Sequence, residues 1–277
     1  MKVLVTGGSG FVGSHLVPRL LDRGHAVTVV ARDTARARAS PWFDRVAFVA
    51  SDLHAVEDPV AALGVPDVLV HLAWPGLPNY DGLFHLEENL PRAYRLVRDL
   101  VVAGTARVLV TGTCFEYGQA SGPLAEDAPT NPTNPYGLAK DTLRRFLVHL
   151  QATRPFVLQW ARLFYMHGPG QNPRSVLAQL DAAIDRGDLA FPMSGGEQLR
   201  DYLPVEAVAD DLATLVDDPS MHGIVNVCRG EPISVRRLVE ERAAARGSAI
   251  RLELGRFPYS PFEPMAFWGQ RGKLAKR

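Results

Sequence analysis

Tyr136 and Lys140 stand four residues apart in the segment NPYGLAK, a spacing that puts both side chains on one face of a helix. A lysine ammonium beside a phenol favours the phenolate, so Lys140 would lower the pKa of Tyr136 from ~10 toward neutrality. Four further reactive side chains are crowded into the segment TGTCFEYG, namely Thr113, Cys114, Glu116 and Tyr117. The residue types therefore favour proton transfer, with a hydroxyl, thiol or carboxylate from the second segment assisting the tyrosine.

Three glycines follow the first apolar run at intervals of three, as Gly7, Gly10 and Gly13 in TGGSGFVG. Glycines between a strand and a helix let the backbone approach a pyrophosphate closely, and the helix N-terminus adds N–H donors and a favourable dipole. A glycine motif of this kind is significant only when a strand precedes it and a helix follows it. Here residues 2–8 have the pattern of a short strand and residues 14–24 have helical spacing. The segment predicts a dinucleotide site.

The end of the second predicted strand, 25–32, discriminates between dinucleotides. An NAD site usually has an acidic residue there, which binds the ribose hydroxyls. This chain has Ala31 and Arg32 instead, and a guanidinium can pair with the 2′-phosphate of NADP and stack on adenine. We therefore predict NADPH as the preferred cofactor, while Asp33 keeps NAD open if the turn shifts by a residue or two.

Strands and helices alternate along the first part of the chain. Apolar runs predict six strands, at 2–8, 25–32, 46–53, 66–74, 106–113 and 156–164. Helical spacing is clearest at 14–24, 89–104 and 137–152. Near-continuous apolar strands that alternate with helices indicate an α/β fold with a doubly wound parallel sheet of Rossmann type, covered on both faces.

The pattern loosens from about Gly168. Segments such as GPGQNPR and FPMSGGEQLRDYLP are rich in Gly, Pro and aromatic residues and indicate ordered loops around a ligand, or a small second lobe. We predict a Rossmann dinucleotide-binding domain at 1–165, with 203–228 returning to it. The remaining residues, 166–202 and 229–277, would form a small C-terminal substrate-binding lobe.

Composition excludes several classes of function. Among 277 residues, 30 basic and 30 acidic side chains cancel, so no overall field favours nucleic acid or an anionic membrane. Two cysteines, Cys114 and Cys228, provide neither a disulfide framework nor a metal pattern, which fits a reducing compartment. No apolar stretch approaches the ~20 residues of a membrane helix, and no secretion signal precedes the first apolar run. We expect a cytoplasmic protein without a metal and without nucleic-acid or membrane partners.

Several motifs together resemble the extended short-chain dehydrogenase/reductase family, in its branch of nucleotide-sugar epimerases, dehydratases and reductases. The likeness runs through TGGSGFVG, SDL at 51–53, HLAW at 71–74, PYGLAK, RLFYMHGPGQ and LRDYLPVEAVADDL, and covers nearly the whole chain. The chain departs from the family pattern at Tyr165, where an Asn is usual. The resemblance implies a Rossmann domain whose later loops form a sugar-nucleotide site.

The resemblance also implies a role for each site residue. The catalytic residues would be Thr113, Tyr136 and Lys140: the threonine hydroxyl hydrogen-bonds the oxygen on the reacting carbon, the tyrosine exchanges its proton, and the lysine also holds the nicotinamide ribose. The cofactor-binding residues would be Gly7, Gly10, Phe11, Val12, Gly13, Arg32, Asp52, Leu53, Leu72, Ala73 and Lys140. The substrate-binding residues would be Thr113, Tyr165, Arg174, Ser175 and Arg200, the last on the diphosphate.

The residues after Thr113 narrow the reaction. Dehydratases of this family carry Asp-Glu there for the removal of water, whereas this chain has Cys114 and Phe115, and strand alternation would aim Glu116 to the opposite side. Reductases of the family that also epimerise use a Cys at the position of Phe115. We therefore predict NADPH-dependent reduction of the C4 ketone of a nucleotide-activated 4-keto-6-deoxy sugar, a step of deoxysugar biosynthesis. The nucleotide base and the stereochemistry at C4 stay open.

Two other functions stay open as well. An NAD-dependent nucleotide-sugar 4-epimerase would use the same catalytic residues, but it usually has the acidic residue that Arg32 replaces. A non-catalytic NAD(P)-binding regulator would typically have lost the Tyr-Lys pair, which this chain retains. The resemblance further implies a homodimer, formed through helices near 85–104 and 137–153.

Overall fold

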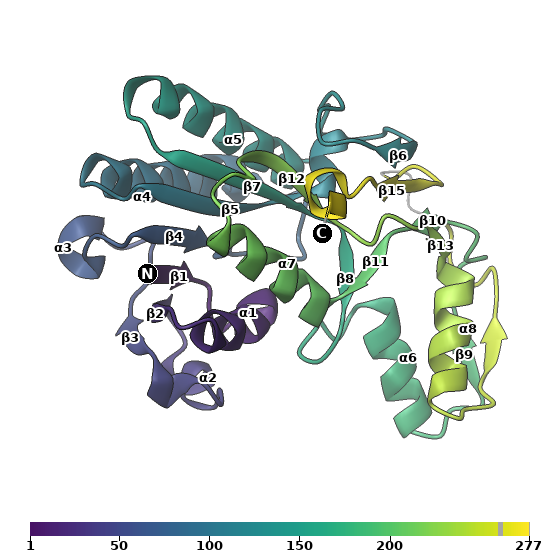
Figure 1. Cartoon of the computed structure of the whole chain (residues 1–277). Coiled ribbons are helices and arrows are strands. Elements are labelled where there is room, and N and C mark those ends of the chain that lie inside the picture. The colour runs from purple at the N-terminus through teal and green to yellow at the C-terminus, as the bar shows by residue number, and fades with distance from the viewer. Residues whose placement is uncertain (260–262, 277) are drawn as a thin grey trace.

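Seven parallel strands form the central sheet of the molecule (Figure 1). The computed structural model describes residues 1–259 and 263–276. The strands are β1 (Lys2–Thr6), β2 (Ala26–Ala31), β3 (Ala47–Ala50), β4 (Val68–His71), β5 (Arg107–Thr113), β7 (Val157–Leu163) and β12 (Gly223–Val227). Their order is β12-β7-β5-β4-β1-β2-β3, and every neighbouring pair is parallel. This confirms the predicted Rossmann-type fold, whose ligand crevice lies where the chain order reverses, between β1 and β4.

Two pairs of helices cover the faces of the sheet (Figure 1). Helices α1 (Phe11–Asp22) and α7 (Val205–Asp217) pack together on one face. Helices α4 (Leu90–Val102) and α5 (Pro135–Thr153) pack together on the other. Short helices α2 (Thr34–Arg38) and α3 (Pro59–Leu63) lie in the connections after β2 and β3. Both faces therefore bury a continuous apolar core, which explains why the strands read as unbroken apolar runs.

The start of α5 is fixed by a cap. Asn134 precedes the helix in extended conformation, and its side-chain oxygen accepts a hydrogen bond of 2.8 Å from the backbone N–H of Gly137. Pro135 occupies the first helical position, where a missing N–H costs nothing. The cap sets the register of the helix and so directs Tyr136 and Lys140 to the same side, toward the end of β5.

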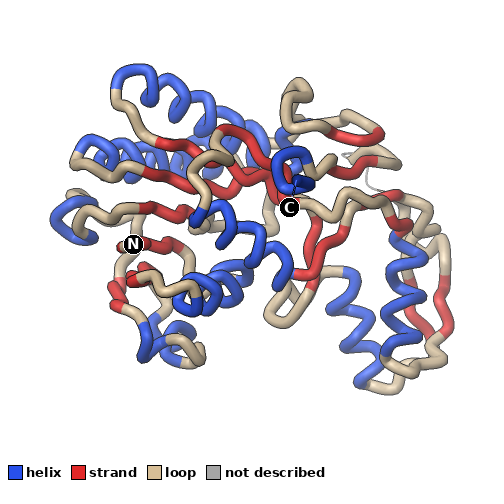
Figure 2. Tube along the Cα trace, viewed as in Figure 1, coloured by secondary structure: helices blue, strands red, loops and turns tan. Residues whose placement is uncertain are grey.

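A smaller lobe lies beside the sheet, as Figure 2 shows. It contains α6 (Val176–Asp185), α8 (Val235–Ala245) and the parallel pair β9 (Ala190–Pro192) and β14 (Arg251–Glu253). Its own apolar cluster includes Leu180 and Val239, both fully buried. The helices were not apparent in the sequence because each is short and flanked by loops rich in Gly and Pro. None of the helices within 1–259 and 263–276 is long and apolar enough to cross a membrane.

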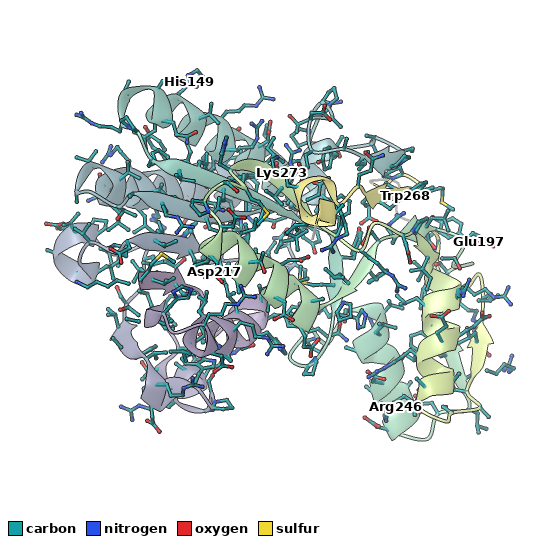
Figure 3. All side chains as sticks on the ribbon, in the orientation of Figure 1. His149, Glu197, Asp217, Arg246, Trp268 and Lys273 are labelled. Atoms are coloured by element: carbon teal, nitrogen blue, oxygen red, sulfur yellow. The ribbon has the colours of Figure 1, made fainter. Side chains whose placement is uncertain are left out.

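Short strand pairs join the lobe to the sheet. They are β8 (Tyr165–His167) with β11 (Tyr202–Pro204), β10 (Leu199–Arg200) with β13 (Ile233–Ser234), and β6 (Gly122–Leu124) with β15 (Phe267–Gly269). The C-terminal turn η4 (Gly272–Lys276) is held by Lys273, labelled in Figure 3, whose Nζ lies 2.8 Å from Oε2 of Glu126. Helix α7 packs on α1, and β12 completes the central sheet. We therefore still propose two parts: a dinucleotide-binding domain of residues 1–165 and 203–228, and a smaller lobe of residues 166–202 and 229–277.

The glycine loop between β1 and α1 is packed too closely for side chains. A Cβ at Gly13 would lie 2.3 Å from the carbonyl oxygen of Gly7 and 2.6 Å from the Cα of Gly8. Gly7 itself has φ +74°, a left-handed conformation that favours glycine. The N-terminus of α1 is preceded by Gly10, which has no side chain to cap it. The first N–H groups of the helix are therefore available to an anion.

We expect Gly13→Ala to destabilise the protein. The new methyl group overlaps the backbone of the glycine loop, and overpacking of this kind costs about 1–3 kcal/mol. The midpoint of thermal unfolding, followed by circular dichroism, should fall by about 2–12 °C. Ser14→Ala, the next residue of the same helix, loses only a hydrogen bond of 3.0 Å to the carbonyl of Phe11 and should cost less. Equal effects of the two substitutions would contradict the steric account.

Candidate active site

One cavity of about 1450 Å³ runs from the glycine loop, across the ends of the central strands, into the smaller lobe. Every residue predicted to bind cofactor or substrate, or to act in catalysis, lines it. These are Gly7, Gly10, Phe11, Val12, Gly13, Arg32, Asp52, Leu53, Leu72, Ala73, Thr113, Tyr136, Lys140, Tyr165, Arg174, Ser175 and Arg200. The fold thus brings together side chains that are up to 193 positions apart in the sequence, from Gly7 to Arg200 (200 − 7).

Thr113 and Tyr136 meet in the middle of this cavity. Thr113 is the last residue of β5, and its hydroxyl accepts a hydrogen bond of 3.3 Å from the backbone N–H of Phe115. It is also hydrogen-bonded to the hydroxyl of Tyr136. Two hydroxyl groups in contact at the open end of a parallel sheet are suited to bind one oxygen atom of a substrate.

Aromatic side chains enclose Tyr136. Its ring centroid lies 5.3 Å from that of His85, 5.6 Å from that of Tyr80 and 6.2 Å from that of Trp74. Burial raises the pKa of the Tyr136 hydroxyl, and Tyr80 acts in the same direction, while the hydrogen bond from Thr113 opposes the shift. The expectation of a lowered pKa is therefore wrong for this structure. The phenol is held in its neutral form, which is a proton donor.

The amino group of Lys140 is directed at the end of β5 and at the ring of Trp74. Its Nζ donates a hydrogen bond of 2.8 Å to the carbonyl oxygen of Thr111 and lies 4.0 Å from the centroid of the Trp74 ring. Burial disfavours the ammonium and lowers the pKa of Lys140 to about 7, although Glu116 acts in the opposite direction. The amino group of Lys140 thus titrates near neutrality, and a negatively charged ligand in the cavity would raise its pKa and favour the ammonium form.

Glu116 does not face the cavity, although the reason differs from the one expected. Strand β5 ends at Thr113, and the next residues form a single 3₁₀ turn, η3 (Cys114–Tyr117). The Glu116 side chain points from this turn into the core, where Oε2 lies 2.7 Å from Nε of Arg162 and Oε1 accepts from the backbone N–H of Thr113 at 2.9 Å. Trp160 donates to both oxygens. All acceptor sites of the carboxylate are engaged, so Glu116 is structural.

Three other polar residues also belong to the framework. Burial raises the pKa of the Cys114 thiol, which forms part of the cavity wall, as predicted. His71 shares a hydrogen bond of 2.8 Å with the hydroxyl of Thr6, and burial lowers its pKa to about 3, so it is a neutral core histidine. Tyr117 is fully buried, with its hydroxyl 2.8 Å from Oδ1 of Asn226, in keeping with a packing role.

The cofactor end of the cavity carries the arginine predicted from the sequence. Arg32 follows β2 directly, is well exposed, and lies 3.8 Å from Oδ2 of Asp52. The carboxylate of Asp33 accepts a hydrogen bond of 2.9 Å from the backbone N–H of Arg36 and so caps α2. The cation of Arg32 and the carboxylate of Asp33 both line the cavity at this strand end, and one oxygen of Asp33 is used in the cap.

The substrate end of the cavity contains two unpaired hydroxyl groups. Among the described residues, the hydroxyls of Tyr165 and Ser175 are buried and have no hydrogen-bond partner. Both hydroxyls line the cavity, where a ligand or water can bond them. Arg174 lies beside Ser175 in the loop before α6. Arg200 lines the same end, but its guanidinium is already bonded to Glu263, with Nη2 2.9 Å from Oε2.

Trp74, Tyr80 and Glu263 are among the residues of this cavity that sequence reasoning missed. Trp74 stands in the motif HLAW, where its place next to the strand end was the available signal. Tyr80 lies in the loop after β4, and its carbonyl oxygen accepts a hydrogen bond of 3.1 Å from the backbone N–H of Tyr136. Glu263 lies near the C-terminus, and no local pattern connects it with the site.

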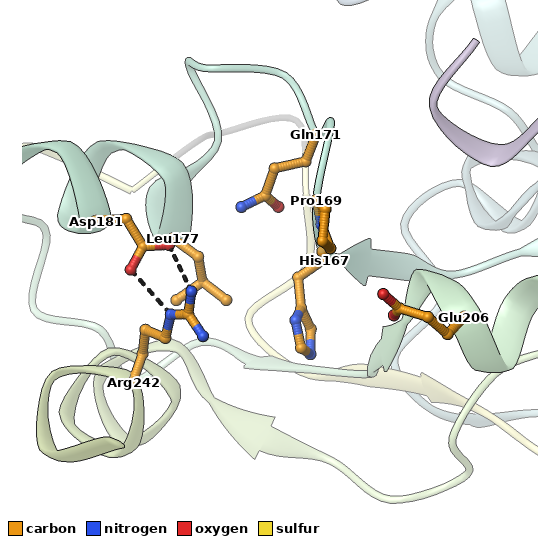
Figure 4. A pocket seen from close by; sticks show the side chains of 8 residues that line it. His167, Pro169, Gln171, Leu177, Asp181, Glu206 and Arg242 are labelled. Atoms are coloured by element: carbon orange, nitrogen blue, oxygen red, sulfur yellow. Dashed lines mark hydrogen bonds and ion pairs between the residues drawn. The ribbon is translucent and has the colours of Figure 1, made fainter. Parts of the chain in front are cut away.

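A second, smaller cavity of about 340 Å³ lies between the lobe and α7 (Figure 4). Figure 4 shows His167 and Glu206 on one side of it and the ion pair of Asp181 with Arg242 on the other. Nη2 of Arg242 lies 2.8 Å from Oδ2 of Asp181, so the charges on the lobe side neutralise each other. The side chain of His167 borders both cavities.

Comparison with known proteins identifies the family. The model of the NAD dependent epimerase/dehydratase family matches residues 3–228. The chain belongs to this family. The matched segment contains the glycine loop, Thr113, Tyr136 and Lys140.

Members of the family with characterised reactions are similar over almost the whole chain. The dTDP-6-deoxy-L-talose 4-dehydrogenase (NAD(+)) of Aggregatibacter actinomycetemcomitans is 29% identical over 277 residues, which cover 98% of this chain and 100% of that enzyme. The UDP-glucose 4-epimerase of Corynebacterium glutamicum is 28% identical, covering 92% of this chain and 83% of that enzyme. The solved structure of MoeE5 in complex with UDP-glucuronic acid and NAD has a TM-score of 0.85 and 28% identity, covering 100% of this chain and 91% of that chain.

We expect Glu116→Ala to unfold the protein more readily, because it leaves the buried guanidinium of Arg162 without its anion. Loss of one partner of a buried ion pair costs about 3–5 kcal/mol, to be measured as the free energy of unfolding in urea. Glu241→Ala removes an exposed ion pair with Arg237 and should cost less than about 0.5 kcal/mol. A loss below about 1 kcal/mol for Glu116→Ala would show that the core tolerates the unpaired cation.

Proposed function

We propose that this protein is an NADPH-dependent oxidoreductase that reduces the C4 ketone of a nucleotide-activated 4-keto-6-deoxy sugar. The observation that carries the proposal is the contact between the hydroxyls of Thr113 and Tyr136. It lies in one cavity, also lined by Lys140, that joins a dinucleotide loop to a lobe with unpaired hydroxyl groups. The cavity has room for both a dinucleotide and a second ligand end to end.

The residues present fit a nicotinamide dinucleotide. The glycine loop leaves space for a pyrophosphate against the uncapped N-terminus of α1, and Lys140 lines the same cavity further along. Gly7, Gly10, Phe11, Val12, Gly13, Arg32, Asp52, Leu53, Leu72, Ala73 and Lys140 would hold the cofactor. When bound, it supplies a hydride to the carbon of the ketone.

The chain's own residues supply the proton and the orientation. Tyr136, held as a neutral phenol by burial, donates its proton to the ketone oxygen as the alkoxide develops. The Thr113 hydroxyl donates a second hydrogen bond to the same oxygen. Lys140 has a pKa near 7, so a negatively charged ligand in the cavity favours its ammonium form, which then stabilises the tyrosine anion left after proton transfer.

Reduction is favoured over dehydration because the two residues that follow Thr113 carry no carboxylate. These residues, Cys114 and Phe115, line the cavity, and burial keeps the thiol of Cys114 protonated. The carboxylate of Glu116, the next residue along the chain, is bonded to Arg162. Removal of water from C5 and C6 needs an acid and a base there, and neither is present on this segment.

The characterised relatives support chemistry at C4. The relative from Aggregatibacter is named for the dehydrogenation at C4 of a dTDP-6-deoxy sugar, which is the reverse of the proposed type of reaction. That name, and the complex of MoeE5, contain NAD rather than NADP, so the preference for NADPH rests on Arg32 alone. For the substrate we propose contacts with Tyr165, Arg174, Ser175 and Arg200.

A nucleotide-sugar 4-epimerase is the second candidate, because the same three catalytic side chains would serve it and a UDP-glucose 4-epimerase is 28% identical. Such an enzyme would carry tightly bound NAD and interconvert UDP-glucose and UDP-galactose without added cofactor. We also propose a homodimer, formed through the outer faces of α4 and α5, where Val102, Phe146 and Val148 are exposed.

The proposed reaction is tested by mixing the purified protein with NADPH and enzymatically prepared dTDP- or CDP-4-keto-6-deoxyglucose. We expect the absorbance of NADPH to fall, and Tyr136→Phe to lower kcat by about 100- to 10,000-fold because the proton donor is lost. Tyr117→Phe removes a hydroxyl that bonds only within the framework and should keep the rate. No oxidation of NADPH with either sugar would reject the substrate class, and an unchanged rate in Tyr136→Phe would reject the donor.

The cofactor preference is tested by Arg32→Asp. A hydrogen bond to a charged group contributes about 1.5–3 kcal/mol, so the substitution should raise the Kd for NADPH by about tenfold or more and leave that for NADH nearly unchanged or lower. Arg38→Asp makes the same change of charge on α2, outside the cavity, and should alter neither value much. Tighter binding of NADH than of NADPH by the unsubstituted protein, measured by fluorescence titration, would overturn the preference.

A further inference from the structure

The buried amino group of Lys140 has an aromatic ring as one of its partners. Its Nζ lies 4.0 Å from the centroid of the Trp74 ring and donates a hydrogen bond of 2.8 Å to the carbonyl oxygen of Thr111. The lysine is only 1% exposed, so little water reaches it. The face of an indole carries a negative potential that attracts a cation, and the attraction is strongest where water is excluded. The Trp74 ring therefore favours the charged form of Lys140.

Buried hydrogen bonds hold the Trp74 ring in place. Its Nε1 donates a hydrogen bond of 3.0 Å to Nδ1 of His85, the first residue of the turn η2 (His85–Asn89), and Asn89 donates to the same nitrogen at 3.2 Å. Indole and amide N–H groups can only donate, so Nδ1 of His85 must be unprotonated. Nε2 of His85 then carries the proton and donates to the carbonyl oxygen of Asn79 at 2.6 Å. The ring is thus tied to the framework through a neutral histidine.

Titratable groups approach Lys140 from four elements. Glu116, in η3, favours the ammonium form, but its carboxylate is bonded within the core. His71 at the end of β4 and His85 in η2 are neutral, because burial and the charge of Lys140 both lower their pKa values. Tyr136, on the same helix as Lys140, is a neutral phenol. Burial lowers the pKa of the lysine to about 7 despite Glu116, so a further stabilising contact decides how much of it is charged at neutral pH.

We propose that Trp74 is a positioning residue, whose indole face holds Lys140 in its ammonium form at the end of β5. The inference rests on the proposed function, in which this ammonium stabilises the anion of Tyr136 after proton transfer. An aromatic face suits the task because it attracts a cation without a negative charge of its own. A carboxylate in the same place would compete with the tyrosine anion for the ammonium and would repel that anion.

A packing role for Trp74 would have the opposite signature. If the ring only excluded water from Lys140, a smaller apolar side chain would admit water and raise the pKa of the lysine. If the ring face stabilises the charge, its replacement by an aliphatic side chain lowers that pKa. Leu and Phe are both smaller than Trp, and of the two only Phe presents a ring face. Comparison of these two substitutions therefore separates the effect of the ring from the effect of size.

The experiment is an NMR titration of the full chain, labelled with ¹³C at the lysine ε-carbons, without cofactor or substrate. The chain has four lysines, Lys2, Lys140, Lys273 and Lys276, and the signal of Lys140 is assigned by its loss in Lys140→Arg. At acidic pH we expect its ε-protons upfield of those of the other lysines, because of the ring current of Trp74. Trp74→Leu should lower the midpoint of its titration by about one pH unit or more, and Trp74→Phe should give an intermediate value.

The pH dependence of kcat for the proposed reduction gives a second readout. The reaction uses the ammonium of Lys140, which is lost as the pH rises through the pKa of the lysine. A lower pKa therefore moves the fall in kcat to lower pH, further in Trp74→Leu than in Trp74→Phe. A residue that only supported the fold would lower kcat at every pH and leave the position of this fall unchanged.

Trp268→Leu makes the same change on β15, outside the cavity, and should leave the titration of Lys140 unchanged. A midpoint that stays or rises in Trp74→Leu, or that is equal in Trp74→Leu and Trp74→Phe, would overturn the inference. If Trp74→Leu does not fold, the ring-current shift and a lowered midpoint in Trp74→Phe decide the question, and absence of either overturns it. Midpoints that fall as expected in a protein that oxidises NADPH with neither keto sugar would leave the ring contact standing and overturn the proposed function.

Discussion

A single buried ion pair holds the reactive end of the sheet in place. The carboxylate of Glu116 and the guanidinium of Arg162 are both 0% exposed and lie 2.7 Å apart, and the same carboxylate accepts from the backbone of Thr113 and from Trp160. It therefore links the last residue of β5 to side chains of the neighbouring strand β7. The carboxylate accepts four hydrogen bonds, and these bonds, rather than those of the guanidinium, whose Nη2 is buried without a partner, restrict the arrangement to one geometry. That geometry sets the position of the Thr113 hydroxyl against Tyr136.

Much of the dinucleotide half could be predicted from the sequence because its determinants are local. The spacing of Gly7, Gly10 and Gly13 indicates a turn that is packed too closely for side chains. The interval of four residues between Tyr136 and Lys140 indicates that both lie on one face of a helix. The parallel sheet was predictable for a similar reason, since strands buried on both faces must be apolar throughout. The glycine loop, the helix face and the apolar strands can be predicted from the sequence because each depends on a few neighbouring residues.

The other half depends on contacts between distant residues. The direction of Glu116 was expected from strand alternation, but the strand ends three residues earlier and a turn decides where the side chain points. Burial raises the pKa of Tyr136, and the aromatic rings around it come from the connection after β4, the helical turn that begins at His85, and η3, which no spacing reveals. Glu263 meets Arg200 across 63 positions of sequence, from a loop to a strand of two residues.

The return of the chain to its first domain has a consequence for synthesis. Helix α7 and strand β12 complete the core around α1 and β7, yet they follow the first half of the smaller lobe in the chain. During translation, the face of the sheet that α7 covers therefore stays partly uncovered until the chain has been synthesised beyond residue 227 and has left the ribosome. In the proposed division of the chain, neither part corresponds to one continuous stretch of residues. The two are bound to fold as one cooperative unit, and a gene fragment that ends after the sixth strand of the sheet would encode an aggregation-prone product.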